Sequence, residues 1–219
     1  MTTDNSVRPG AIARLRSRQS GLPTGLLGRF FGRAMESATA PANNRALAAL
    51  DLSEPRTVLE VGFGQGRSVA ELVRLGHRVL GVDASPTMVT QAAARNRTAS
   101  RDGHVTLLHG DGTSIPFPDD SADAALTVHT IYFMPDPAAT LADIARVVRP
   151  GGTLVIACRT SDTATPAWMD PDVYRIRSTA EIITMLRAAG FARVEHTINS
   201  PNEDDHVFVA HLAADPGTP

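Results

Sequence analysis

The sequence is poor in cysteine and has no long apolar run. Cys158 is the only cysteine among 219 residues, which excludes an intramolecular disulfide and a disulfide-stabilised fold. It ends the apolar run LVIAC, where no neighbour would activate a thiol, so we interpret it as a small buried side chain rather than a nucleophile. No segment approaches the roughly 18 to 20 apolar residues of a membrane span, and the N-terminus lacks the apolar segment of a signal peptide. We therefore expect a cytoplasmic protein without a membrane partner.

Neither sign of charge dominates the sequence. Its 21 Lys and Arg residues and 23 Asp and Glu residues give a formal net charge of −2, so no overall basic field would attract nucleic acid. A local cluster in the N-terminal segment could still contact phosphates, and it consists of Arg8, Arg14, Arg16 and Arg18. No RNA-binding module accompanies this cluster. We expect a small-molecule ligand and no nucleic acid partner.

The sequence patterns change at about residue 52. Residues 1–21 are polar and Arg-rich without a sustained period, so we expect a mobile, irregular arm unless it folds over a ligand. Residues 22–52 carry two helical patterns, the second opened by Pro41. We expect residues 1–52 to form an N-terminal arm with cap helices, and residues 53–219 to form one α/β domain.

Strand and helix patterns alternate through this second part. The expected strands are residues 56–62, 77–83, 104–111, 122–130, 153–159, 192–198 and 206–213, and the expected helices are residues 67–76, 85–96, 136–152 and 178–190. Such alternation predicts right-handed crossovers and a parallel sheet covered on both faces. The polar turn NSPNEDD favours antiparallel pairing of the last two strands. The expected fold is a doubly wound, mixed seven-stranded sheet, with an antiparallel last strand at its edge and additional N-terminal helices.

The stretch LEVGFGQGRS follows the pattern of the first strand. Its glycines, Gly62, Gly64 and Gly66, permit a tight turn and let a ligand touch the main chain. The spacing is GxGxG, and Arg67 breaks the GxGxxG pattern of dinucleotide-binding loops. In a doubly wound sheet, this position borders the crevice where ligands bind.

Three acids stand at successive strand ends. Glu60 would bring a negative charge beside the glycine loop, which disfavours a pyrophosphate and favours an amine or a cationic ligand. Asp83 could accept both hydroxyls of a ribose, and Asp111 could accept from an exocyclic amine. Together they suit a nucleoside that carries amines and a positive centre.

At these motifs the sequence resembles the class I S-adenosylmethionine-dependent methyltransferases, over about residues 56–213. VLEVGFGQG, VLGVDASPTM and LHGDGTSIPFPDDSAD resemble the first three motifs of that family, in order. DAALTVHTIYFMPDP and LADIARVVRPGGTLVIA resemble its fourth strand, substrate-facing loop and next crossover. The resemblance implies a Rossmann-like catalytic domain over residues 53–219. It also implies transfer of a methyl group from S-adenosyl-L-methionine to an acceptor by in-line displacement, with S-adenosyl-L-homocysteine as the product.

The resemblance also implies the cofactor-binding positions. The glycine loop would line the methionyl part with Glu60 near the amine, Asp83 would bind the ribose, and Asp111 would bind the adenine amine. The complete set is Glu60, Gly62, Phe63, Gly64, Gly66, Asp83, Ala84, Met88, Gly110, Asp111, Gly112 and His129. The alternatives are ordinary ones: strand-end or capping acids, an Asp-Gly turn, and a core position for Met88.

His129 ends the fourth strand pattern and is the candidate catalytic residue. A histidine has a suitable pKa for a general base, which is needed only if the acceptor must lose a proton. In the family that the sequence resembles, this position often contacts the methionyl group through its backbone. The side chain of His129 could therefore only line the cofactor site and take no part in proton transfer. No metal site is expected.

Acceptor recognition is expected from segments outside the shared motifs. The candidate substrate-binding residues are Phe31, Met35, Tyr132, Arg159, Trp168 and Tyr174. Within residues 159–178, aromatic side chains could close over an apolar acceptor, and Arg159, Arg175 and Arg177 could meet an acid. The alternative is that these segments only pack on the main domain, or that the apolar face of residues 25–38 forms a homodimer contact.

Two other functions fit parts of the pattern. A nicotinamide-dependent oxidoreductase could share the fold, although the GxGxG spacing and Glu60 disfavour it. A relative that binds S-adenosylmethionine without methylating any acceptor would retain all the cofactor motifs. The acceptor atom and molecule are not specified by the sequence.

Overall fold

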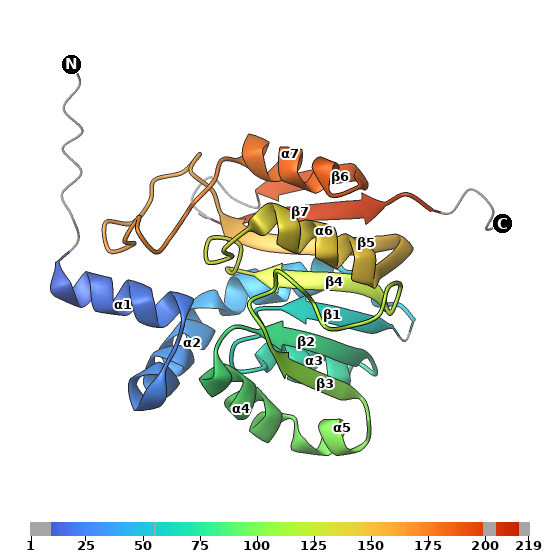
Figure 1. The fold of residues 1–219 in the computed structure, drawn as a ribbon, viewed down its shortest axis with the longest axis horizontal. Helices are drawn as coiled ribbons and strands as arrows, with labels where there is room; N and C mark the ends of the chain where they lie inside the picture. The colour runs from blue at the N-terminus through green and yellow to red at the C-terminus, as the bar shows by residue number, and fades with distance from the viewer. Residues whose placement is uncertain (1–9, 55, 199–204, 215–219) are drawn as a thin grey trace.

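The computed structural model describes residues 10–54, 56–198 and 205–214, and the side chains of residues 26–34 lie outside that description. The helices are α1 (Ala11–Gly21), α2 (Gly25–Ala49), α3 (Arg67–Arg74), α4 (Pro86–Arg95), α5 (Arg97–Arg101), α6 (Pro137–Val147) and α7 (Thr179–Ala188). The strands are β1 (Thr57–Val61), β2 (Arg78–Asp83), β3 (Val105–His109), β4 (Ala122–Val128), β5 (Val148–Arg159), β6 (Phe191–Ile198) and β7 (Asp205–Leu212). Figure 1 shows these strands as one layer, with α1 beyond one end of the sheet.

The sheet has the strand order β3-β2-β1-β4-β5-β7-β6. Strands β1 to β5 pair in parallel, and β7 runs antiparallel to both β5 and β6. The doubly wound mixed sheet with an antiparallel last strand is thereby confirmed. The expected edge position of β7 is wrong, because β7 is inserted between β5 and β6. The two strands differ in how apolar they are. Val207, Phe208 and Ala210 of β7 are buried inside the sheet, whereas β6 is mostly exposed and is therefore suited to the edge.

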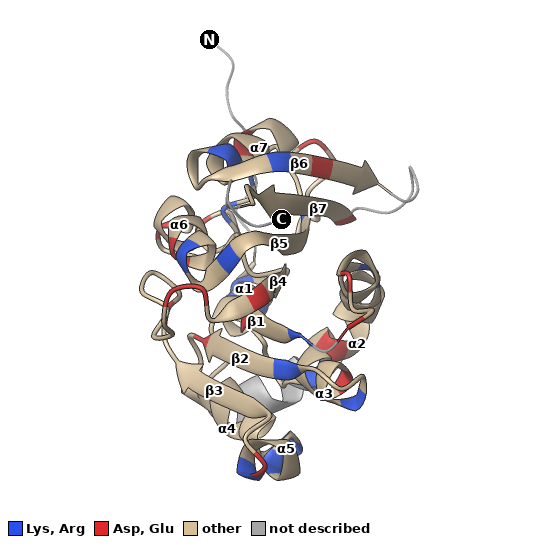
Figure 2. Cartoon of the chain, turned by 90° about the vertical axis from the view of Figure 1, so that its right-hand side faces the viewer, with Lys and Arg blue, Asp and Glu red and all other residues tan. Residues whose placement is uncertain are grey.

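Helices cover both faces of the sheet, as Figure 2 shows. Helices α2, α3 and α4 pack on one face, and α6 and α7 pack on the other. Each face has its own apolar core, as the sequence periodicity predicts. The fully buried helix residues of the two cores are Ala42, Ala46, Val69, Leu72 and Ala92 on the first face, and Leu141, Ile144, Val147, Ile182 and Leu186 on the second.

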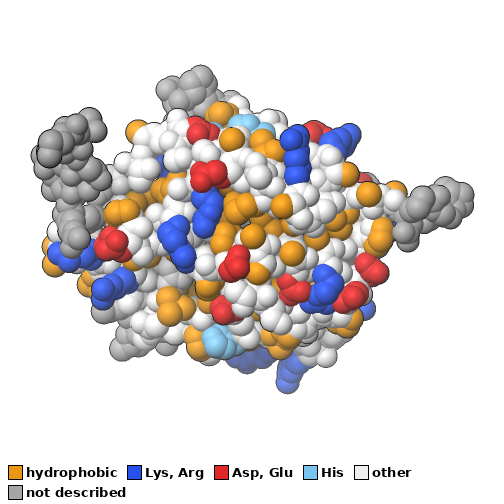
Figure 3. Space-filling view, turned by 45° about the horizontal axis from the view of Figure 1, so that its top comes forward, with side chains coloured by type: hydrophobic (Ala, Val, Ile, Leu, Met, Phe, Trp, Pro, Cys, Tyr) orange, Lys and Arg blue, Asp and Glu red, His pale blue; other side chains and the backbone are white. Residues whose placement is uncertain are grey.

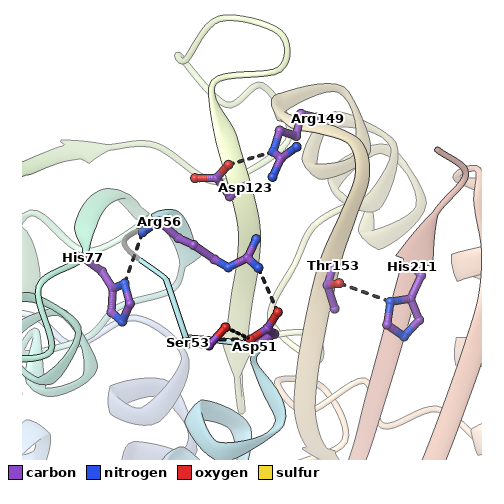
Figure 4. Close-up of polar contacts among 8 residues, drawn as sticks. All are labelled: Asp51, Ser53, Arg56, His77, Asp123, Arg149, Thr153 and His211. Atoms are coloured by element: carbon purple, nitrogen blue, oxygen red, sulfur yellow. Dashed lines mark hydrogen bonds and ion pairs between the residues drawn. The ribbon is translucent and has the colours of Figure 1, made fainter. Parts of the chain in front are cut away.

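Polar side chains fix the amino ends of the strands (Figure 4). Asp123, at the start of β4, accepts from the backbone N–H of Thr57 at 2.7 Å and from Arg149 Nε at 2.7 Å. Arg56 donates its backbone N–H to His77 Nδ1 at 3.3 Å and pairs through its guanidinium with Asp51 at 2.8 Å. These contacts hold the starts of β1, β4 and β5 together. The carboxyl ends of the parallel strands are left for the functional site.

The N-terminal segment differs from the expected irregular arm, because residues 11–21 form α1. Ser17 is fully buried, donates to Trp168 O at 3.0 Å and accepts from Asp170 N–H at 3.0 Å. The Arg16 guanidinium lies 3.8 Å from the centre of the Trp168 ring. These contacts with a segment distant in sequence stabilise a helix that its own composition does not predict. Residues 1–9 lie outside the described residues.

Two element boundaries also differ from the expectation. Residues 25–49 form one helix that contains Pro41, not two helices. Ala42 and Ala46, which follow the proline, are buried against the sheet and stabilise the helix there. Strand β5 begins at Val148, so Pro150 and its glycines lie inside the strand and do not close the preceding helix. Short α5 is an element that the sequence patterns do not predict. The residues 199–204 of the expected turn lie outside the described residues.

The surface carries both signs of charge. On the face shown in Figure 3, basic and acidic side chains are interspersed and are not gathered by sign. None of the helices in the described part of the chain has the length and hydropathy of a membrane-spanning segment.

Candidate functional site

A cavity of about 850 Å³ lies at the carboxyl ends of β1, β2 and β4. Its floor is formed by the loops that follow these strands, and its remaining walls come from α1, α2 and residues 172–173. This is the crevice in which doubly wound sheets bind ligands. The volume lies near the upper end of the range for small-molecule sites, so it can hold more than one small reactant.

The glycine loop takes a conformation that favours glycine. The φ angles of Gly62, Gly64 and Gly66 are +79°, +53° and +74°. Gly62 donates its N–H to Val82 O at 2.8 Å, and a Cβ at Gly62 would overlap the side chain of Thr130. Nothing lies within 4 Å of a Cβ built at Gly64, which lines the cavity. The loop therefore presents open backbone to the cavity.

Asp83 ends β2 in the cavity wall and is 9 % exposed. Its Oδ2 accepts from Gly64 N–H and its Oδ1 from Ser85 N–H, both at 2.8 Å. Burial raises the pKa of Asp83, and it outweighs the opposing effect of these two donors. Each oxygen still has a free lone pair, so the carboxylate can accept further hydrogen bonds from a ligand.

Glu60 is the deepest acid of the site, and 3 % of its surface is exposed. Ser68 Oγ donates to Glu60 Oε1, and Oε2 has no hydrogen-bond partner among the described residues. Burial raises the pKa of Glu60 to about 7, with a smaller contribution from the charge of Asp83 and a partial offset from the Ser68 bond. A buried acceptor without a donor is a ready partner for an amine.

The third strand end is more open. Gly110, Asp111 and Gly112 line the cavity, and the Asp111 side chain is exposed to solvent. Its Oδ1 accepts from the Thr113 hydroxyl at 2.7 Å and from Thr113 N–H at 3.0 Å, and these bonds lower the pKa of the carboxyl. Asp111 is therefore an ionised acceptor at the cavity rim.

His129 occupies the wall at the end of β4 with φ +52°, which is unusual for a residue other than glycine. Its Nδ1 lies 2.5 Å from the Tyr132 hydroxyl, and its Nε2 lies 3.5 Å from Asp205 Oδ1. Both ring nitrogens thus face protein partners. In this geometry neither nitrogen offers a free lone pair to a molecule in the cavity.

Eleven of the twelve proposed cofactor positions line this cavity, and Gly66 does not: it packs against Ala92 and Asn96 of the neighbouring helix. The structure also separates the proposed acceptor residues. Of the latter, Met35 lines the cavity. The others that the structure describes do not line it: Tyr132, Arg159, Trp168 and Tyr174. Phe31 lies among the residues whose side chains are not described. Tyr132, Trp168 and Tyr174 pack together with Phe133 behind the wall, with ring centres 4.8–5.7 Å apart in successive pairs.

The arginines of residues 159–178 have structural contacts. Arg175 donates to Met134 O at 2.9 Å and to Pro135 O at 3.4 Å, and Arg177 donates to Arg175 O at 2.9 Å. They fix the loop after β4 from outside. Cys158 is fully buried and burial raises its pKa, so the thiol is held in its neutral form.

Sequence reasoning missed part of the cavity wall. The apolar residues Leu15, Leu22, Pro23, Phe133, Met134, Pro135 and Val173 line one side, with Arg18 and Gln19 beside them. Those of α1 were missed because the segment was not expected to be helical. Phe133 belongs to the same loop as Tyr132, which the sequence suggests as a substrate-binding residue. Only the backbone geometry determines which of the two rings faces the cavity. The described residues contain no cluster of three or more His, Cys, Asp or Glu side chains that could hold a metal ion.

Comparison with known proteins matches this site to one family. Residues 59–156, which include the glycine loop and all three acids, match the family model described as a methyltransferase domain. Residues 59–156 belong to the class I S-adenosylmethionine-dependent methyltransferase family. A solved complex between the Haloferax volcanii Trm112 methyltransferase activator and a methyltransferase matches with a TM-score of 0.74 and 25% identity, covering 90% of this chain and 97% of that chain.

Two curated methyltransferases are 30% and 40% identical in sequence to parts of this chain. An O-methyltransferase, resE, of Aspergillus sclerotiorum is 30% identical over 74% of this chain and 65% of its own length. A demethylmenaquinone methyltransferase of Tropheryma whipplei is 40% identical over 51% of this chain and 45% of its own length. The chain spans less than two thirds of the length of these relatives.

The cofactor of this methyltransferase family fits the observed site. The unpaired Glu60 Oε2 suits the amine of a methionyl group, and the two accepting oxygens of Asp83 suit ribose hydroxyls. The open backbone at Gly64 leaves room for a ligand to approach.

Proposed function

We propose that this protein is an S-adenosylmethionine-dependent methyltransferase that acts on a small-molecule acceptor. The observation that carries the proposal is the convergence of Glu60, Asp83 and the glycine loop on one cavity of about 850 Å³. None of these three features alone identifies a ligand, but a nucleoside that bears an amine can bind to all three at once.

Each group has a definite task in this proposal. Glu60 binds the amine through Oε2, Asp83 binds the ribose, and Asp111 at the rim binds the adenine amine. Met88 and Ala84 lie in the same wall and give the adenine an apolar surface. When bound, S-adenosylmethionine supplies an electrophilic methyl group on a sulfonium. The chain then contributes chiefly by aligning the two reactants and excluding water.

The apolar side of the cavity defines the acceptor compartment. Leu15 of α1 and Leu22 directly after it face the same space as Phe133, Met134 and Val173, which favours an acceptor with an apolar body. The names of several relatives support a small molecule: they are methyltransferases of demethylmenaquinone and of 27-O-demethylrifamycin SV. Residues 1–52 would act as a cap that completes this compartment, and residues 53–219 as the cofactor-binding domain.

The geometry of His129 restricts the chemistry. With Nδ1 on Tyr132 and Nε2 on Asp205, the ring serves as a wall and does not remove a proton from the acceptor. We therefore propose an acceptor that reacts without a histidine base, such as an acidic hydroxyl, a thiolate or a free amine.

Calorimetric titration with S-adenosylhomocysteine, in parallel with NADH, tests the proposal. Binding of the former alone is expected, and binding of NADH alone would replace the proposal by an oxidoreductase. A following screen measures formation of S-adenosylhomocysteine with acidic phenols, thiols and amines that have apolar bodies. Binding without turnover over the whole screen would favour a non-methylating relative. The fold permits that outcome, since a structure titled [4+2]-cyclase SpnF shares it with a TM-score of 0.66 at 19% identity.

A further inference from the structure

We propose that Asp205 is a positioning residue that fixes the orientation and tautomer of His129 in the cavity wall. Its role in the reaction rests on the proposed methyltransferase function, whereas its effect on His129 does not. Asp205 lies outside the matched family region of residues 59–156 and does not line the cavity.

The antiparallel strand explains how Asp205 reaches the site. Because β7 runs opposite to β5, its first residue lies at the carboxyl edge of the sheet, where Asp205 pairs with Arg159. On the other side of β5, His129 donates its backbone N–H to Ala157 O at 2.8 Å. The insertion of β7 beside β5 thus brings an acid within 3.5 Å of the imidazole.

The charge state of Asp205 follows from its neighbours. Burial acts to raise its pKa, but the contact with His129 and the positive charges of Arg159 and Arg45 outweigh burial and lower it. Arg45 Nη2, on α2, lies 3.1 Å from Asp205 Oδ2. Asp205 is therefore an ionised carboxylate that can only accept hydrogen bonds.

The tautomer of His129 is then determined. A carboxylate 3.5 Å from Nε2 favours the proton on Nε2, which leaves Nδ1 of a neutral imidazole as an acceptor. The Tyr132 hydroxyl, 2.5 Å from Nδ1, is the matching donor. Burial raises the pKa of Tyr132 well above 10, so the hydroxyl keeps its proton. The ring faces Tyr132 of the same loop and Asp205 of β7. The charged and titratable groups that act on these two partners are Arg45 of α2 and Cys158 and Arg159 of β5.

The position of this ring matters for the cavity. His129 has a left-handed backbone conformation, which is unfavourable without tertiary support. The next residue, Thr130, packs directly on Gly62 of the glycine loop. The Tyr132 hydrogen bond and the 3.5 Å contact with Asp205 thus support the turn on which the loop rests, and Asp205 connects this turn through Arg45 to the cap helix α2.

Nitrogen-15 spectra of the histidine side chains at pH 8, where a free imidazole is neutral, test the proposal directly. The full-length wild-type chain should show His129 as the Nε2–H tautomer alone. Asp205→Asn, whose amide oxygen still accepts, should retain that tautomer, and Asp205→Ala should give a mixture. Glu195→Gln is the control: it changes an exposed acid of the neighbouring strand β6 that lies 3.6 Å from His211, so it should leave the His129 signals unchanged. A pure Nε2–H tautomer in folded Asp205→Ala would overturn the proposal.

Tyr132→Phe covers the case in which Asp205→Ala fails to fold. It should keep the Nε2–H tautomer, because Asp205 still accepts that proton, and a switch to Nδ1–H would overturn the proposal. For the reaction, kcat of Asp205→Ala should fall at least tenfold with partial rescue in Asp205→Asn. The Kd for S-adenosylhomocysteine should rise as well, because the glycine loop rests on the same turn. Unchanged kcat would overturn the role in the reaction. If the wild-type chain does not bind S-adenosylhomocysteine, the proposed function is contradicted, whereas the proposal for the His129 tautomer is not.

Discussion

Asp83 Oδ2 accepts a hydrogen bond from the backbone N–H of Gly64 at 2.8 Å. This bond links the end of β2 to the glycine loop after β1, so the carboxylate is oriented before any ligand binds. Ser85 N–H fixes the other oxygen at 2.8 Å. A carboxylate held in this way binds a ligand with little loss of side-chain entropy.

Asp83→Ala should weaken binding of S-adenosylhomocysteine by about 1.5 to 3 kcal/mol, because two charge-assisted bonds to the ribose are lost. Calorimetric titration measures this as a roughly tenfold or greater rise in Kd. Asp102→Ala, at an exposed acid outside the cavity, is the matched control and should bind as the wild type does. Equal affinities for the two variants would place the ribose elsewhere.

Cofactor affinity should depend on pH through Glu60. Its pKa is raised to about 7, so at pH 6 the folded protein holds the proton and the amine meets a neutral acid. Affinity for S-adenosylhomocysteine should therefore rise roughly eightfold between pH 6 and pH 7.5 as Glu60 ionises. Glu60→Gln should bind more weakly at pH 7.5 and lose this dependence. A persistent pH dependence in that variant would assign it to another group.

The same acid should affect stability in the opposite direction. A carboxyl whose pKa is higher in the folded state than in the unfolded chain binds its proton more tightly when folded, so the free energy of unfolding falls as pH rises from about 4.5 to 7. Urea denaturation of the cofactor-free protein across this range should show a steeper fall for the wild type than for Glu60→Gln. Identical slopes would indicate that Glu60 titrates normally.

Gly62→Ala should destabilise the protein by more than backbone strain alone. Gly62 and Gly103 have nearly equal φ angles, +79° and +76°, but only an added Cβ at Gly62 overlaps another side chain, that of Thr130. We expect a loss of about 1 kcal/mol for Gly103→Ala and about 2 to 4 kcal/mol for Gly62→Ala, measured by urea denaturation. Equal losses would mean that Thr130 moves aside without cost.

Docking of α1 should depend on the Trp168 ring. Trp168→Ala removes the surface under Arg16, 3.8 Å away, while the Ser17 bond to the backbone of residue 168 remains possible. Trypsin should then cleave after Arg14, Arg16 and Arg18 roughly 2- to 10-fold faster, because α1 opens more often. Trp168→Phe, which keeps an aromatic face, should lie between the two. Unchanged cleavage rates would show that Ser17 alone holds the helix.

Local sequence patterns predicted most of the sheet and the cofactor side of the cavity. Strands β1 to β4 and helices α3, α4 and α7 match their patterns because the apolar periodicity and the capping residues act within each element. The glycine loop and the strand-end acids follow from the chain order alone, since parallel strands bring their carboxyl ends to one edge.

The tertiary structure decided the acceptor side. Helix α1, the unbroken α2 and the inward choice of Phe133 over Tyr132 depend on contacts with residues 160–178 and with the sheet, which no local pattern contains. The place of Asp205 depends on β7 being inserted between β5 and β6, because strand order reflects competition between whole apolar faces. Thus the sequence by itself determined the fold class and the cofactor motifs through short-range chemistry, and only long-range packing decided which side chains enclose the second reactant.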